Sequence, residues 1–172
     1  LQTGTGGLAA PITVGKLTTG GTTITLNSSG AVTTQGALKT GAGSGGNVSI
    51  TSAGGALTIN DSIDTRPLTA GASGNITLSS ATSISVPSAT LFGNTLSATA
   101  GTGNVTGGIG NGGSGSVATQ VSNLTVTNSG SGNVKFTNTG TALIVNSVSQ
   151  NASGGTVAIT SGQGGTFDLT LN

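Results

Sequence analysis

The sequence predicts an all-β chain that folds as a parallel β-helix, also called a β-solenoid. Two observations carry this prediction: a tripeptide that recurs at a nearly constant interval, and short stretches in which apolar and polar residues alternate. Gly-Asn-Val or Gly-Asn-Ile occurs at 46–48, 74–76, 103–105 and 132–134, with steps of 28, 29 and 29 residues. A repeat of this length is typical of a chain that winds through similar turns, rather than of a globular domain with one unique site.

The composition independently favours strands and tight turns. Gly, Thr, Ser and Asn make up 101 of the 172 residues, and Glu, His, Cys, Met, Trp and Tyr are absent. Because Gly, Thr, Ser and Asn are poor helix formers and dominate every long stretch, helices are disfavoured nearly everywhere. One third of the residues are apolar and only 4% are charged, which is not the composition of a disordered chain. The absence of Cys excludes a disulfide framework and thiol chemistry.

Each tripeptide opens a segment in which every second residue is apolar. The segments are 48–51, 76–79 and 134–137, with a weaker copy at 105–107. Alternation places Val48, Ile76, Val105 and Val134 in one inward column and the intervening Ser, Thr and Lys outside. Further apolar segments follow at 57–60, 84–86 and 143–145 and at Val117, and then a third set: Ile63, Leu68, Leu91, Leu96, Val121, Leu124, Val148 and Val157.

We therefore predict one solenoid segment over 1–172, with about six turns of roughly 28 residues and three short strands per turn. The same pattern extends upstream through Ile24, Val32 and Leu38, and downstream through 157–159 and 167–171. No capping helix is visible at either end. Solenoids need polar caps for solubility, so an uncapped array predicts neighbouring turns in a longer chain, or head-to-tail stacking of copies.

The repeated Gly-Asn pair is interpreted as a corner of the solenoid. Asn47, Asn75, Asn104 and Asn133 are predicted to form a side-chain hydrogen-bond ladder up the stack. The Gly before each Asn would permit backbone angles that are closed to other residues. Seven Asn-x-Ser/Thr sequons occur, and three of them coincide with these corners, which favours a structural role for the Asn over glycosylation.

The charges cluster only at Asp61, Asp64 and Arg66, with Lys16, Lys39, Lys135 and Asp168 elsewhere. Two carboxylates beside an Arg could serve a glycosidase or lyase, or Asp61 and Asp64 could contribute to a Ca²⁺ site. No His or Tyr exists to share proton transfer. The favoured interpretation is a solvated corner with a local ion pair, and no catalytic residue, cofactor or metal is predicted.

Net charge and hydropathy exclude two kinds of partner. The net charge of +1 provides no positively charged surface for nucleic acid. The sequence contains no run of about 18 apolar residues, so no membrane-spanning helix is predicted. The first residues, Leu1-Gln2-Thr3-Gly4, do not resemble a signal peptide. We expect the chain to be a processed or excised piece of a longer protein.

The stretches 45–60 (GGNVSITSAGGALTIN) and 73–80 (SGNITLSS) resemble the repeats of filamentous-haemagglutinin-like bacterial exoproteins. The likeness is clearest over 45–86 and 131–171. It implies a long, right-handed β-helical surface adhesin, exported largely by two-partner secretion and located outside the cell or on the bacterial surface. The turns of that family are typically shorter than the 28–29-residue spacing here.

The expected function is a structural, non-enzymatic shaft or stalk segment of a secreted surface fibre or adhesin, associating with itself or with adjacent repeats. A first alternative is a β-helix module that binds a carbohydrate or host surface. A second is ice binding through outward Thr, although the pairs Thr23/Thr25, Thr125/Thr127 and Thr137/Thr139 do not share one position of the repeat. A degenerate polysaccharide-active β-helix is the remaining alternative.

Overall fold

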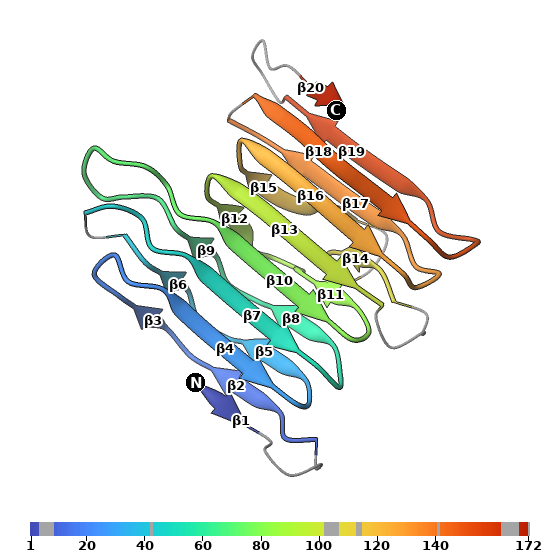
Figure 1. The fold of residues 1–172 in the computed structure, drawn as a ribbon, viewed down its shortest axis with the longest axis horizontal. Helices are drawn as coiled ribbons and strands as arrows, with labels where there is room; N and C mark the ends of the chain where they lie inside the picture. Colours follow the sequence, from blue (N-terminus) through green and yellow to red (C-terminus); the bar gives the residue numbers. More distant parts are fainter. Residues whose placement is uncertain are drawn as a thin grey trace.

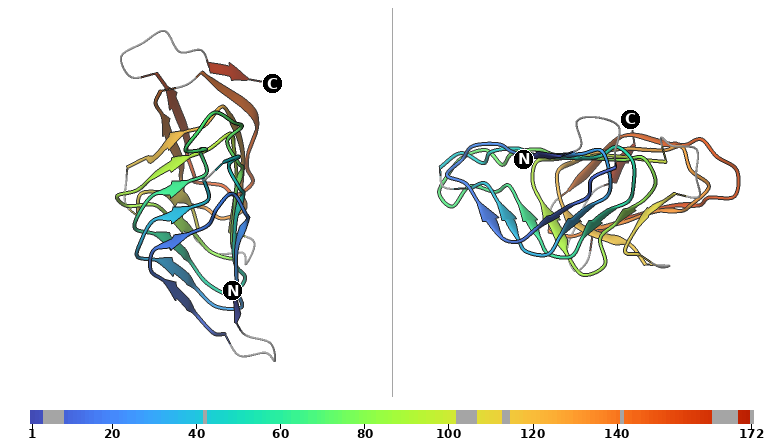
Figure 2. Two further views of the ribbon diagram at one scale, coloured as in Figure 1. Left: turned by 90° about the vertical axis from the view of Figure 1, so that its left-hand side faces the viewer. Right: turned by 90° about the horizontal axis from the view of Figure 1, so that it is seen from below.

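The computed structural model describes residues 1–3, 9–41, 43–101, 107–112, 115–140, 142–162 and 169–171. Over these ranges the chain forms only strands, turns and bends, and it winds through about six turns as a β-solenoid, as predicted (Figure 1). No helix in the described ranges is long and apolar enough to cross a membrane. Every pairing between named strands is parallel (Figure 2).

Three stacked columns of strands, named A, B and C here, form the walls of the solenoid, and the chain visits them in that order. Column A is one sheet of eight strands. Its strands are β1 (Gln2–Thr3), β4 (Ile24–Ser28), β7 (Val48–Ser52), β10 (Ile76–Ser80), β13 (Thr95–Ala100), β16 (Asn123–Asn128), β18 (Leu143–Gln150) and β20 (Leu169–Leu171).

Columns B and C are the two halves of the second sheet. Strand β17 pairs with the last strand of each column and so connects them. Column B contains β2 (Ile12–Val14), β5 (Val32–Thr34), β8 (Leu57–Ile59), β11 (Ile84–Ser85) and β14 (Ile109–Gly110). Column C contains β3 (Leu17–Thr18), β6 (Leu38–Lys39), β9 (Ile63–Asp64), β12 (Thr90–Phe92) and β15 (Val117–Gln120). Above both columns lie β17 (Val134–Asn138) and β19 (Val157–Ser161).

At β17 the corner between columns B and C disappears. Val134 of β17 pairs with Ile109 in column B, whereas Phe136 pairs with Val117 in column C. One straight strand thus replaces two strands and a corner, and β19 pairs with β17 along its whole length. The predicted three strands per turn are found from β1 to β15, whereas the turns β16–β17 and β18–β19 have two strands each.

The turns are not uniform in length. In column A, Ile24 stacks on Val48, Val48 on Ile76, Ile76 on Leu96, and Leu96 on Leu124, which are steps of 24, 28, 20 and 28 residues. The predicted column of Val48, Ile76, Val105 and Val134 is therefore wrong beyond its first pair. Val105 lies outside the described residues, and Val134 belongs to column B.

The corners differ in length, and this explains why the constant interval of the tripeptide predicted the wrong stacking partners. Between columns C and A the chain uses 65–75 after β9 but only Gly93 and Asn94 after β12. This shortens one turn, so the later tripeptide at 132–134 moves to the corner between A and B. For the same reason 143–145, predicted as a second segment, forms part of β18 in column A.

Alternation within the strands was predicted correctly, and it builds the core. β4, β7 and β10 each bury their first, third and fifth residues. The resulting core is a continuous stack of Ile, Leu and Val side chains, with Phe136 as its largest member. Leu68, placed in the third apolar set from the sequence, is instead 80% exposed within the loop 65–75, because that loop leaves the wall of the solenoid.

The fifth residue of β4, β7 and β10 is polar and buried. Ser28, Ser52 and Ser80 are fully buried and stack in register at the corner between A and B. Each hydroxyl donates toward a carbonyl oxygen of the same corner one turn earlier: Ser28 to Ala10 (2.5 Å), Ser52 to Gly30 (2.8 Å) and Ser80 to Gly55 (2.8 Å). This internal serine ladder satisfies carbonyls that point away from the strand pairing.

The ladder continues upward with amides. The two N–H groups of Asn128 Nδ2 are shared among the carbonyls of Gly107 (3.1 Å), Gly130 (3.0 Å) and Gly132 (2.8 Å), and Gln150 Nε2 donates to Gly130 (2.8 Å). Ala100 occupies the same column and has no polar side chain. There the backbone N–H of Gly101, which has a φ of 75°, donates to the Thr82 carbonyl (2.7 Å).

The glycines of the repeated tripeptide are required for space rather than for their backbone angle. None of Gly46, Gly74 and Gly132 is among the glycines with positive φ. A Cβ on Gly46 would lie 2.5 Å from the Thr22 carbonyl oxygen, and one on Gly132 would lie 2.6 Å from the Gly107 carbonyl oxygen. The prediction of special corner angles is wrong at these three positions, and close approach between turns is the reason for Gly.

Replacing Ser80 with Ala tests the internal ladder. The change removes the Ser80 hydroxyl that donates to the Gly55 carbonyl and accepts from the Thr82 N–H, while Ser52 Oγ stays 2.9 Å from the same carbonyl. The free energy of unfolding should therefore fall by about 0.5–1.5 kcal/mol, the contribution of a hydrogen bond. Ser79→Ala, the same substitution at the neighbouring outward position, should change it by less than about 0.5 kcal/mol. Urea unfolding followed by circular dichroism measures both, and equal losses in the two variants would contradict a stabilising role for the ladder.

Candidate functional site

The predicted charge cluster lies on the outside of column C and at its corner with column A. Asp64 ends β9, and Arg66 is the second residue of the long loop 65–75. Arg66 Nε donates to Asp64 Oδ1 (2.9 Å) and Arg66 Nη2 to Asp64 Oδ2 (2.8 Å), in a bidentate ion pair. The backbone N–H of Arg66 also donates to Oδ1 (3.1 Å).

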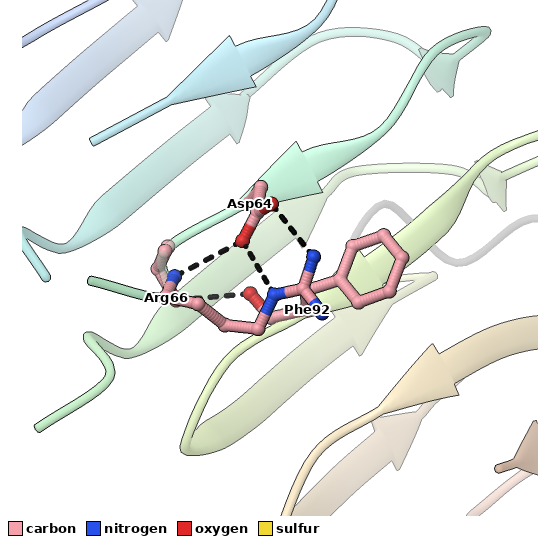
Figure 3. A network of polar contacts seen from close by, with 4 residues as sticks. Asp64, Arg66 and Phe92 are labelled. Atoms are coloured by element: carbon pink, nitrogen blue, oxygen red, sulfur yellow. Dashed lines mark hydrogen bonds and ion pairs between the residues drawn. The ribbon is translucent and has the colours of Figure 1, made fainter. Parts of the chain in front are cut away.

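Phe92 of the next turn completes the arrangement (Figure 3). It is the register partner of Asp64 in column C, so its side chain emerges directly above the carboxylate. The guanidinium carbon of Arg66 lies 3.8 Å from the centre of the Phe92 ring, within cation–π distance. The carboxylate and the ring together hold the guanidinium in one orientation.

The ion pair changes the pKa of both partners. Partial burial raises the pKa of Asp64, but hydrogen bonds from Arg66 and the charges of Arg66 and Lys39 outweigh it and lower the pKa. The hydrogen bonds that Arg66 donates to the Asp64 carboxylate raise the pKa of Arg66. Lys39 contributes because it is the register partner of Asp64 in the turn below. Asp64 is therefore ionised, and both of its oxygens are engaged.

Asp61 does not join this cluster. It lies exposed at the corner between columns B and C, where its Oδ1 accepts a hydrogen bond from the backbone N–H of Ser62 (2.7 Å). A cation held by Asp61 and Asp64 would have to displace Arg66 from Asp64. In the described part of the chain no group of three or more acidic, His or Cys residues could hold a metal ion. Asp168 lies outside the described residues.

The predicted asparagine ladder is divided between two corners. Asn47 Oδ1 accepts a hydrogen bond from the Asn75 backbone N–H one turn later (2.8 Å), at the corner between C and A. Asn133 Oδ1 accepts from the backbone N–H of Thr156 (2.9 Å), at the corner between A and B. Asn104 lies outside the described residues. The side chains of Asn75 and Asn94 are 3.5 Å apart, which is too long for a strong hydrogen bond.

The two corners use the asparagine in the same way. In each, the side-chain oxygen binds the N–H that precedes the first inward residue of the strand in the next turn. The tripeptide therefore marks the start of a strand rather than one fixed corner.

Unequal loops create a notch beside the ion pair. The long loop 65–75 is closed at its base, where Thr65 Oγ1 donates to the Gly74 carbonyl (2.8 Å) and the Gly74 N–H donates to the Thr65 carbonyl (2.9 Å). The corners of the next two turns are only two residues long. The space above the overhanging loop has a volume of about 380 Å³ and is lined by Arg66, Ala72, Ser73, Gly93, Asn94, Gln120 and Ser122.

A second hollow, of about 280 Å³, lies on column B and is lined in part by Ser83, Ser85, Asn133 and Lys135. Neither hollow was predicted, because each depends on which loops become neighbours after the turns stack. The sequence contains one signal for the first notch: the charged residues gather where the longest corner begins.

Comparison with protein-family models, with curated proteins and with solved structures finds no match to this chain. The chemistry of the site itself is therefore the guide to its function. That chemistry comprises one fixed cation, side-chain amides and hydroxyls around an open notch, without a pair of free carboxylates among the lining residues.

The ion pair predicts a specific dependence of stability on pH. Because the pKa of Asp64 is lowered on folding, its stabilising contribution is complete above the unfolded pKa of about 3.9 and is lost as the pH falls through the lower folded value. Asp64→Asn should reduce the free energy of unfolding by less than about 1 kcal/mol at neutral pH, since the pair is partly exposed. The gap between the two proteins should close at low pH.

Denaturant unfolding at several pH values between neutral and acid measures this gap. Asp61→Asn, which removes the same charge beside the cluster without breaking the ion pair, is the matched control. A gap between wild type and Asp64→Asn that stays constant as the pH is lowered would contradict the proposed linkage.

Proposed function

We propose that the chain is a non-enzymatic shaft segment of a secreted bacterial surface fibre or adhesin of the filamentous-haemagglutinin type. The observation that carries this proposal is the unbroken sheet of column A. Its eight strands pair in parallel from β1 to β20, so each turn is tied to the next by backbone hydrogen bonds along the whole segment (Figure 1). A continuous ladder of this kind transmits force and position between distant modules.

The shape and surface of the segment support the same role. The core is a linear stack with no enclosed site among the described residues, and only seven side chains in the whole chain are charged. Near-neutral surfaces lack the long-range repulsion that keeps rods apart. The turns of 20 and 21 residues in column A, from Ile76 to Leu96 and from Leu124 to Val145, also come closer to the shorter turns of that family than the tripeptide interval did.

The end near β19 suggests how such segments associate. Val157 stacks on the fully buried Val134, yet Val157 is 44% exposed because no described strand covers it. Inward-facing apolar residues at an open end favour the addition of another turn, either from the same chain or from a second copy. The shaft would thereby grow end to end, by the same strand pairing that builds each segment.

Assembly of the purified chain tests this proposal. We expect concentration-dependent end-to-end filaments, visible by electron microscopy and giving an axial diffraction spacing of about 4.8 Å. Val157→Lys should abolish them, because it places a charge in the end contact. Thr77→Lys adds the same charge to the outer face of column A and should leave end-to-end assembly intact. Discrete monomers of the wild-type chain at all concentrations would contradict end-to-end growth.

Ice binding is a second candidate, supported by the outer face of column A. Although Thr23/Thr25 and Thr125/Thr127 are offset by two residues along the strand, hydroxyl and amide side chains do share columns there. Thr25, Ser49, Thr77, Ser97 and Thr125 are in register, as are Asn27, Thr51, Ser79, Thr99 and Thr127. Thr137 lies apart, in β17. The spacing is about 4.8 Å between turns and about 6.6 Å along each strand.

A regular array of this kind could hold a layer of ordered water against a growing ice crystal. The candidate predicts inhibition of ice recrystallisation by the wild-type chain and its loss in Thr77→Lys, at the centre of the array. Val157→Lys, which carries the same added charge outside the array, should retain it. Ice crystals that grow equally with and without the wild-type chain would exclude this function.

A further inference from the structure

We propose that the notch above the loop 65–75 binds the carboxylate-bearing ring of an acidic saccharide, with Arg66 as the carboxylate-binding residue. This inference goes beyond the shaft function, which requires no ligand. The notch is built by a change in corner length between successive turns. The long corner after β9 supplies Arg66, Ala72 and Ser73 on one side, and the two short corners above it supply Gly93, Asn94 and Ser122 on the other.

Arg66 is held in place before any ligand arrives. A guanidinium has five N–H donors, and Asp64 uses two of them. Nη1 has no hydrogen-bond partner among the described residues, and the side chain is 46% exposed. Phe92 covers one region of the guanidinium at 3.8 Å. A donor that is fixed in this way loses little conformational entropy on binding, which favours affinity.

The charge at the notch selects an anion. Arg66 is the one charged residue of the lining. Asp64, whose oxygens are both engaged, balances its charge, and Lys39 in the turn below adds a positive charge outside the notch. The remaining donors of Arg66 suit a carboxylate, because the planar guanidinium matches its geometry. No acidic side chain lines the notch, so an incoming carboxylate meets no like charge there.

The rest of the lining suits sugar hydroxyls. Asn94 and Gln120 present amides, and Ser73 and Ser122 present hydroxyls, so the notch offers both donors and acceptors. Gln120 is the register partner of Phe92 in the next turn, so it lies one turn above the ring that contacts the Arg66 guanidinium. Ala72 and Gly93 are small and leave room for a ring. The volume of about 380 Å³ is at the lower end for small-molecule sites, which fits a single sugar ring.

Two matched ligands and two matched variants test the proposal. Methyl glucuronide and methyl glucoside differ only in the carboxylate, and binding is measured by the perturbation of amide signals in NMR titrations. We expect the wild-type chain to bind the glucuronide with a Kd on the order of 1 mM and the glucoside at least about tenfold more weakly. The perturbed amides should include those of Arg66, Asn94 and Ser122.

Gln120→Glu places a negative charge in the notch without touching the ion pair, and it should weaken glucuronide binding at least about tenfold. Gln35→Glu makes the same change at an exposed corner elsewhere and should bind as the wild type does. Arg66→Gln should also lose glucuronide binding, with urea unfolding confirming that this variant is folded.

Four outcomes would overturn the proposal: no glucuronide binding by the wild type, equal affinity for the glucoside, equal binding by Gln120→Glu and Gln35→Glu, or perturbed amides outside the notch. Competition by sodium acetate at the same concentration as the glucuronide would show that only a free carboxylate is recognised, and would overturn the saccharide assignment. The notch lies on the side of the rod and Val157 at its end, so this test and the assembly test can fail independently.

Discussion

The corner carbonyls between columns A and B set the main constraint on this fold. A solenoid satisfies its strand backbones by stacking, but at each corner the chain turns and some carbonyls point inward, away from water. At five levels of column A one side chain answers that need: Ser28, Ser52, Ser80, Asn128 and Gln150 each donate to a carbonyl one turn earlier. Because an unpaired buried carbonyl is costly, this position must be a donor, or must be followed by a backbone that supplies one, as at Gly101. The apolar columns can then stack without interruption.

The corners between columns C and A are not under this constraint, so their lengths can vary from turn to turn. The candidate site lies where two such corners of different length meet. The corner between columns C and A changes from the long loop 65–75 to two residues without disturbing the strand register on either side. Thr65 closes the base of the loop by its hydrogen bond to Gly74, so the strands on either side keep their pairing. The ion pair of Asp64 and Arg66 sits where the long corner meets the short ones, and register brings Lys39 and Phe92 to it from the turns below and above.

The sequence predicted the fold class and the inward residues of individual strands because alternation is a local property. Val48, Ile50, Ile76 and Leu78 could be assigned from their neighbours alone. The same alternation, continued by one step, places Ser52 and Ser80 inside, but the predicted segments ended one residue before them. The stacking partners between turns were harder to predict. Gly93 and Asn94 carry no repeated tripeptide, so nothing in the sequence indicated the 20-residue turn, and Val134 was assigned to the wrong column. The notch could not be predicted, because it exists only between loops of different turns.

The fusion of columns B and C into β17 has a consequence for how the rod bends. Below this level three walls meet at three corners, and such a section resists bending about every transverse axis. At β17 and β19 the section has two walls facing each other, and a flattened section bends more easily about the axis that lies in its own plane. The upper turns are therefore expected to bend more easily about this one axis than the three-walled turns below them.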